Sequence, residues 1–129
     1  DIYRTYFKKV IFISPYFTTQ STINAFFSKE QRKELYLNGY TYRKGIYADL
    51  SFFSGVNDFS EFCTLTKKHQ DIILVISAAN DQFIPMKDIN QFYKEIGQMP
   101  IIIAKADHNY LDGDSRKELI SKIIEYIEG

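Results

Sequence analysis

Three short apolar runs, separated by helical patterns, constrain the fold of this chain more than any other feature. They cover about residues 10–14, 72–77 and 100–104, and β-branched residues dominate them. Each run is apolar at consecutive positions, which is typical of a strand buried on both faces of a parallel sheet. Strands that alternate with helices predict an α/β layer architecture with mostly parallel strands and right-handed crossovers.

The flanking helices are predicted from their apolar spacing and from the signals at their ends. Residues 1–9 are predicted to end one helix, and residues 85–96 to form another that Gly97 stops. A last helix is predicted to be capped by Asp114 or Ser115. Its apolar positions form a stripe that we expect to pack against the sheet, namely Leu119, Ile120, Ile123, Ile124 and Ile127.

Residues 16–70 are polar and interrupted, and we expect them to form a short cap or insertion. Ser28 and Gln31 have the spacing of a capping box, which predicts a helix that Asn38 and Gly39 end. A hairpin or extended arm is predicted to follow, and then two short helices. These helices are predicted over Asp49–Phe53 and over Asp58–Lys67, with Asp58 and Ser60 as candidate caps of the second.

Length and charge exclude several classes of protein. The chain has 129 residues, enough for one domain but not two. Its 16 Lys and Arg residues balance its 16 Asp and Glu residues, so it lacks the basic excess of a nucleic-acid-binding protein. No apolar run has the length of a membrane span, and no signal-peptide pattern is present. Cys63 is the only cysteine, which favours a reducing compartment and hence a cytoplasmic location.

Asp81 and His108 are the candidate catalytic residues. Each follows one of the predicted strands, and they lie 27 residues apart. Groups beyond the carboxyl ends of parallel strands meet at one edge of the sheet, so we expect both side chains, together with Ser14, to converge there. An imidazole suits proton transfer at neutral pH, and a carboxylate that accepts its Nδ1–H fixes the tautomer. The alternatives are a surface loop histidine and an aspartate that caps or turns its loop.

Other candidate site residues have simpler explanations. Asp107, Asp112 and Asp114 are predicted to be turn and cap residues. His69 precedes a strand at its opposite end, so we expect a solvated loop residue far from the site. Neither histidine has the spacing of a zinc ligand set, and no glycine-rich phosphate loop is present, so no metal or cofactor is expected. Cys63 is expected to be a small buried hydrophobic residue.

Two segments resemble the C-terminal half of an α/β-hydrolase. The run V-I-S-A-A-N-D-Q-F-I-P, residues 75–85, is similar to the strand and loop that carry the catalytic acid, although Ala78 stands where many members have glycine. The run A-D-H-N-Y, residues 106–110, is similar to the loop that carries the catalytic base. The resemblance implies that Asp81 is the acid and His108 the base. It also implies one partial domain over residues 1–129, with a cap in residues 16–70 and the acid and base in residues 71–129.

The family's nucleophile motif, G-x-S-x-G, does not occur in the chain. Ser14 follows a strand, but Pro15 after it is a poor start for the helix that a nucleophile requires. The chain begins with Asp1 rather than Met, so we expect residues upstream that include the serine. The resemblance thus implies part of a serine hydrolase of small carboxylic esters, or else of thioesters or peptides, that is inactive by itself.

A second hypothesis from another class is a catalytically inactive hydrolase-like module. Three parallel strands leave a row of unpaired backbone groups at the edge of the sheet. We therefore expect either the missing N-terminal half or a second copy of the chain to complete the sheet.

Overall fold

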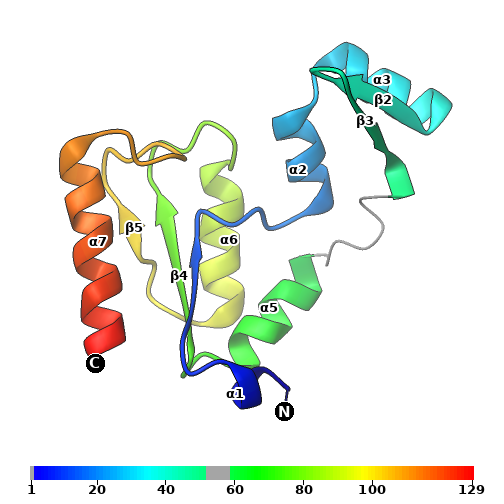
Figure 1. The fold of residues 1–129 in the computed structure, drawn as a ribbon. Coiled ribbons are helices and arrows are strands. Elements are labelled where there is room, and N and C mark those ends of the chain that lie inside the picture. Colours follow the sequence, from blue (N-terminus) through cyan, green and yellow to red (C-terminus); the bar gives the residue numbers. More distant parts are fainter. Residues whose placement is uncertain (1, 52–58) are drawn as a thin grey trace.

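The computed structural model describes residues 2–51 and 59–129 and has a mixed α/β architecture (Figure 1). Its centre is a parallel sheet of three strands in the order β1-β4-β5. The strands are β1 (Val10–Ile13), β4 (Ile73–Ala78) and β5 (Ile102–Ile103). The three predicted strands and their parallel direction are confirmed, although β5 has only two residues.

Helices cover both faces of this sheet (Figure 1). They are α5 (Phe59–Lys68), α6 (Met86–Ile96) and α7 (Gly113–Glu128), whereas the short α1 (Ile2–Tyr6) lies at the end of the sheet where β1 begins. Successive residues of β4 point to opposite faces. Val75 packs in one hydrophobic cluster with Cys63 of α5 and Phe92 of α6, whereas Ile76 packs in another with Leu119 of α7. A helical layer thus lies on each face of the sheet, which explains why the strands are apolar on both faces. Cys63 is buried, as predicted.

A smaller unit follows β1 and lies beside the sheet (Figure 1). It contains α2 (Thr19–Phe26), α3 (Lys29–Asn38) and an antiparallel hairpin of β2 (Tyr40–Arg43) and β3 (Ile46–Asp49). Ile23, Phe27 and Leu35 form its buried core. This unit is only part of the predicted cap or insertion over residues 16–70, because α5 falls in the same range and packs against the sheet. The sequence patterns do not predict α2, which is short and begins at a cap formed by Thr18.

The end signals of the predicted helices are mostly confirmed. Ser28 and Gln31 form the complete capping box of α3, and Gly39 ends that helix with a φ of 80°. Gly97 ends α6 in the same left-handed conformation, with a φ of 70°. The predicted hairpin is also present. Asp49, predicted to begin a helix, is instead the last residue of β3, and Ser60, a candidate cap, lies inside α5. The rest of the helix predicted over residues 49–53 extends beyond the described residues, and the cap predicted at Asp58 lies outside them.

The predictions for α7 need two corrections. The N-cap is Asp112 rather than Asp114 or Ser115, because its carboxylate accepts a hydrogen bond from the backbone N–H of Ser115 at 3.0 Å. The predicted stripe also does not pack as one face. Leu119 is buried and Ile123 is partly buried, but three isoleucines stay largely exposed, namely Ile120 at 49%, Ile124 at 47% and Ile127 at 60%. The sheet is too narrow to cover them.

His69 is buried, with 1% of its surface exposed, so the prediction of a solvated residue is wrong. It directly follows α5, and its carbonyl accepts hydrogen bonds from the N–H groups of Ile72 and Ile73. This tight turn joins the end of α5 to β4. Burial lowers the pKa of His69, and the nearby charge of Lys68 adds to that effect. Its predicted position at the opposite end of β4 from Asp81 is confirmed.

No helix in the described residues is long and apolar enough to cross a membrane.

Candidate functional site

The loops that follow β4 and β5 are joined by backbone hydrogen bonds at the carboxyl edge of the sheet. The N–H of Ala79 donates to the carbonyl of Ile103 at 3.0 Å, and the N–H of Asn80 donates to the carbonyl of Ala106 at 2.9 Å. The ladder between the two strands thus continues past their ends. Because Asp81 comes next in one loop and His108 lies close by in the other, the two side chains are brought together.

Asp81 and His108 form a direct hydrogen bond. Nδ1 of His108 lies 2.8 Å from Oδ2 of Asp81. The Asp81 side chain is 1% exposed and the His108 side chain is 19% exposed. The predicted contact between these two residues is therefore present, with the carboxylate buried beneath a partly accessible imidazole. A buried carboxylate in this position holds the Nδ1–H tautomer and stabilises the imidazolium cation when it forms.

The second carboxylate oxygen of Asp81 is used to shape its own loop. Oδ1 accepts hydrogen bonds from the N–H groups of Phe83 at 2.8 Å and Ile84 at 2.9 Å. Asp81 therefore both turns its loop and contacts the histidine, so the two explanations weighed from the sequence do not exclude each other. Gln82 adds a further link, since its Oε1 accepts a hydrogen bond from the backbone N–H of His108 at 3.1 Å. Both carboxylate oxygens of Asp81 are thus held by hydrogen bonds.

The imidazole of His108 lies between two aromatic rings. The Tyr16 ring is 5.4 Å away, centroid to centroid, and the Phe83 ring is 5.2 Å away at an interplanar angle of 85°. Throughout the described part of the chain, no group forms a hydrogen bond with Nε2 of His108. An imidazole with one nitrogen held by a carboxylate and the other available is arranged to move a proton at Nε2.

Ser14 also reaches this edge of the sheet, as predicted, but it contacts a different residue. Its Oγ lies 3.1 Å from the hydroxyl of Tyr110, and both residues are buried. Ser14 has a φ of 47° and Tyr110 a φ of 53°, in the left-handed region that few non-glycine residues adopt. Such backbone strain concentrates at functional sites. Because its hydroxyl bonds to Tyr110 and not to His108, Ser14 is not placed as the nucleophile.

Two tyrosines lie in the electrostatic field of Asp81. Burial is the main cause of the raised pKa of Tyr110. The hydrogen bond to Ser14 lowers this pKa, and the charge of Asp81 raises it further. The pKa of Tyr16 is also raised, first by burial and then by the charge of Asp81. The sequence predictions omit both tyrosines. Their positions in the sequence could have indicated them, since Tyr16 closely follows the end of β1 and Tyr110 follows His108 by two residues.

The remaining candidates have structural roles. Asp107 accepts a hydrogen bond from the N–H of Leu111, and Asp112 caps α7, so both are turn or cap residues as predicted. Asp114 lies in the first turn of α7. Burial raises the pKa of the Cys63 thiol, which disfavours a reactive thiolate. In the ranges that the structure describes, no cluster of three or more His, Cys, Asp or Glu side chains is arranged to hold a metal ion.

Comparison with known proteins adds no assignment: no protein-family model matches the chain, and no curated protein matches its sequence.

Proposed function

We propose that this chain is the acid- and base-bearing part of a serine hydrolase that acts on small carboxylic esters. The observation that carries the proposal is the 2.8 Å hydrogen bond between buried Asp81 and Nδ1 of His108, with Nε2 left without a partner in the described residues. These are two members of a Ser-His-Asp triad in the geometry that the mechanism requires. The third member is a serine contributed by a segment that precedes residue 1.

The order of the parts supports an α/β-hydrolase-like fold for the whole enzyme. The acid follows the middle strand of the sheet and the base follows β5, after which a single long helix ends the chain. The family's chain order is nucleophile, acid, base, and here the acid precedes the base. The smaller unit of α2, α3 and the hairpin lies between β1 and β4, where we propose that it forms a short cap.

In this mechanism, Nε2 of His108 removes the proton of the serine hydroxyl as the serine oxygen attacks the ester carbonyl. Asp81 stabilises the resulting imidazolium and does not itself take the proton. The imidazolium then donates its proton to the departing alcohol, which leaves an acyl-serine. A water molecule, deprotonated by the same Nε2, attacks the acyl group, and the carboxylic acid departs as the serine recovers its proton.

The test uses the protein with its upstream residues. A fluorophosphonate probe labels an activated serine covalently whatever the natural ester is, and hydrolysis of p-nitrophenyl butyrate gives a rate. We expect His108→Ala to lower both by a factor on the order of 10⁴ or more, and Asp81→Asn to lower them by a similar factor. Asn109→Ala is the matched control, because Asn109 is exposed in the same loop. Unchanged labelling of the His108→Ala variant would overturn the proposal.

The geometry behind the mechanism has its own readout in the 129-residue chain. The ¹⁵N resonances of an imidazole distinguish the Nδ1–H tautomer from the Nε2–H tautomer. We expect His108 to be protonated on Nδ1 at alkaline pH. In Asp81→Asn, the amide retains an oxygen for the loop N–H groups of Phe83 and Ile84 but presents a donor to Nδ1. The tautomer is then expected to change while the fold remains.

A second candidate function is a non-catalytic module that pairs with another copy. Among the described residues, β1 pairs only with β4, so its other edge has unpaired backbone groups. The exposed isoleucines Ile120, Ile124 and Ile127 of α7 also favour association. The fluorophosphonate experiment separates the two candidates, because a non-catalytic module contains no serine that the probe labels in a manner dependent on His108.

A further inference from the structure

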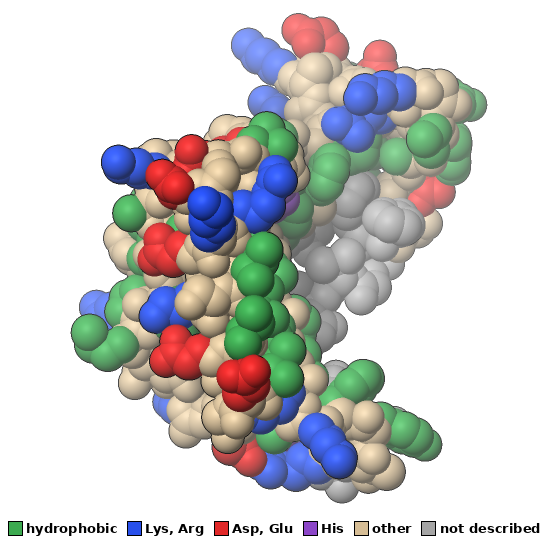
Figure 2. Space-filling view, turned by 60° about the vertical axis from the view of Figure 1, so that its left-hand side comes forward, with side chains coloured by type: hydrophobic (Ala, Val, Ile, Leu, Met, Phe, Trp, Pro, Cys, Tyr) green, Lys and Arg blue, Asp and Glu red, His purple; other side chains and the backbone are tan. Residues whose placement is uncertain are grey.

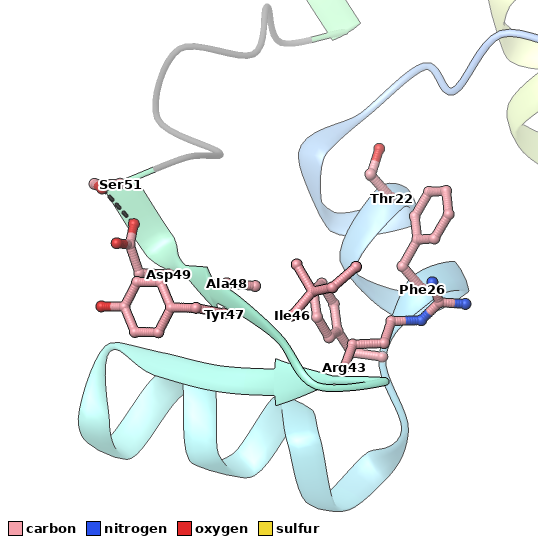
Figure 3. A pocket seen from close by; sticks show the side chains of 9 residues that line it. Thr22, Phe26, Arg43, Ile46, Tyr47, Ala48, Asp49 and Ser51 are labelled. Carbon is pink, nitrogen blue, oxygen red and sulfur yellow. Dashed lines mark hydrogen bonds between the residues drawn. The ribbon is translucent and has the colours of Figure 1, made fainter.

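A groove lies between α2 and the β2–β3 hairpin (Figure 3). Its volume is about 730 Å³, which is within the usual range of small-molecule sites. Its walls are mostly apolar, and they include side chains from both elements. The lining residues that matter for the following argument are Phe26, Arg43, Ile46, Ala48 and Asp49.

Arg43 is the distinctive group of this groove. Its guanidinium lies over the ring of Phe26, 5.3 Å from the centroid, and the residue is partly buried. No carboxylate of the described residues lies within ion-pair distance of Arg43, and its guanidinium donates no hydrogen bond to them. A guanidinium is a planar fork of donors that matches a carboxylate in two parallel hydrogen bonds. A partly desolvated, unpaired fork beside apolar walls therefore favours an anionic group on an apolar ligand.

The acidic residue of the groove does not neutralise this charge. Asp49 pairs with Tyr40 in the hairpin register, whereas Arg43 pairs with Ile46 at the other end. The two positions are three residue steps apart along the hairpin, which is about 10 Å. Side chains alternate between the faces of the hairpin, so Arg43, Ile46 and Ala48 share one face and Asp49 lies on the other. Asp49 accepts a hydrogen bond from Ser51, and Figure 3 shows this pair apart from Arg43 and Phe26.

Aromatic rings connect the groove to the Asp81–His108 pair. The Phe26 ring lies 5.4 Å from the Tyr16 ring, and the Tyr16 ring lies 5.4 Å from the imidazole of His108. The charges of Asp81 and Arg43 act on the pKa of Tyr16 in opposite directions, which places Tyr16 within reach of both. The rings of Phe26 and Tyr16 thus lie between a ligand seated in the groove and the imidazole of His108.

We propose that this groove binds an apolar chain bearing a carboxylate, with the carboxylate held by Arg43 and the chain held against Phe26, Ile46 and Ala48. The inference rests on the proposed function in one respect: it makes the substrate an ester that also carries a free carboxylate. The binding itself requires neither a serine nor His108.

The experiment measures binding to the 129-residue chain by calorimetry and by amide shifts in NMR spectra. The probes are octanoate, octanol and octylammonium, which share one apolar chain and differ in charge. We expect octanoate to bind roughly tenfold or more tightly than octanol, as a charge-assisted hydrogen bond predicts, and octylammonium to bind most weakly. The largest amide shifts are expected at Ile46 and Ala48. Equal affinity for octanoate and octanol would overturn the proposal, as would tighter binding of octylammonium.

Variants then assign the charge to Arg43. Arg43→Gln is expected to bind octanoate no better than octanol, while its affinity for octanol stays unchanged and reports that the groove is intact. Lys44→Gln is the matched control, since it removes one positive charge from the next residue, which does not line the groove. An octanoate preference that survives Arg43→Gln, or a variant that loses octanol binding as well, contradicts the specific role of Arg43.

His108→Ala separates this inference from the proposed function. We expect the variant to bind octanoate with the affinity of the wild type. If octanoate binds but serine labelling does not depend on His108, the hydrolase proposal fails and the groove assignment stands. Labelling that depends on His108 in a protein that does not prefer octanoate would do the reverse.

Discussion

At the scale of single residues, the hydroxyl pair of Ser14 and Tyr110 is expected to hold the edge of the candidate site together. The two oxygens are 3.1 Å apart and buried, and they join the exit of β1 to the loop of His108. Tyr110→Phe leaves the hydroxyl of Ser14 buried without this partner. We expect it to lower the free energy of unfolding by about 1–2 kcal/mol, measured by urea denaturation.

A double-mutant cycle isolates that hydrogen bond. The variants are Ser14→Ala, Tyr110→Phe and both together, and the expected coupling energy is about 1 kcal/mol. The φ of 47° at position 14 imposes strain on alanine, but this strain enters both arms of the cycle and cancels. Additive effects within about 0.3 kcal/mol would show that the hydroxyl pair does not stabilise the loops.

Residue types at strand ends explain why Asp81 and His108 were predictable. Parallel strands deliver whatever follows them to one edge, so sequence position alone predicts that the pair converges. The neighbouring rings of Tyr16 and Phe83 were not predicted, because their approach to the imidazole depends on loop conformation. That conformation is fixed partly by the bonds of Asp81 Oδ1 to its own loop, which no pattern of residue types specifies.

At the scale of helices and strands, two glycines at helix ends give opposite predictions for the same substitution. Gly39 ends α3 with a φ of 80°, and an added Cβ meets nothing within 4 Å, so the cost of Gly39→Ala is backbone strain alone. We expect a loss of about 1 kcal/mol in the free energy of unfolding. Gly113 begins α7 without a positive φ and with equal space. Gly113→Ala is expected to add about 0.5 kcal/mol.

Urea denaturation of the two variants beside the wild type measures both effects. Since each change adds one methyl group in open space, their difference reports backbone conformation. Equal effects of the same sign would contradict the left-handed end of α3.

The cap of α7 is expected to make stability depend on acid pH. Hydrogen bonds from the backbone N–H and the hydroxyl of Ser115 hold the pKa of Asp112 below its usual value. A lowered folded-state pKa means that the stabilisation is complete above the unfolded pKa and is lost as the pH falls through the folded one. Asp112→Asn keeps an acceptor but does not titrate. We expect the wild type to be more stable than Asp112→Asn at neutral pH.

The measurement is urea denaturation of both proteins at neutral pH and at about pH 3 or below. The advantage of the wild type is expected to shrink in acid because Asp112 becomes protonated. The other carboxyl groups titrate in both proteins, so their contributions cancel in the comparison. A difference that does not change with pH would show that the carboxylate form of Asp112 adds nothing.

Helix existence was easier to predict than helix ends. The apolar spacing of α6 and α7 identifies both, and a glycine marks the end of α6. The start of α7 was predicted two or three residues late because the run D-G-D-S offers three capping side chains. Which of these side chains caps the helix depends on which one reaches the backbone N–H of Ser115. Ser115 Oγ also lies 3.3 Å from the carbonyl oxygen of Ala104, which directly follows β5, so the start of the helix contacts the end of the sheet.

At the scale of the whole molecule, burial of polar groups was the least predictable property. His69 follows a polar stretch and precedes a strand, and both facts favour exposure. His69 is nevertheless buried in the tight turn between α5 and β4. Its burial depends on how this turn packs, which the residue pattern does not specify. The groove beside Arg43 depends in the same way on how α2 faces the hairpin. Composition and periodicity predict layers, but they do not predict how a connecting unit sits beside them.

Two features on the outside of the molecule predict that the chain associates with itself. One is the edge of β1 that pairs with no other strand of the described residues, and the other is the row of exposed isoleucines at positions 120, 124 and 127 of α7. Figure 2 shows a strip of hydrophobic side chains among charged ones on the face that carries α7. Both features remain on the surface of the folded chain. Sedimentation velocity at tens of micromolar is therefore expected to show species above the chain mass of 15.1 kDa.

The contribution of α7 is tested with Ile120→Lys combined with Ile124→Lys. These side chains are 49% and 47% exposed, so we expect the fold to persist while the association constant falls at least roughly tenfold. Leu37→Lys is the matched control, because Leu37 is 72% exposed on α3 but has no place in the isoleucine row. If the double variant and the control associate equally, α7 is not the contact. If the wild type sediments as a monomer throughout, the module hypothesis loses its physical basis and the hydrolase proposal alone remains.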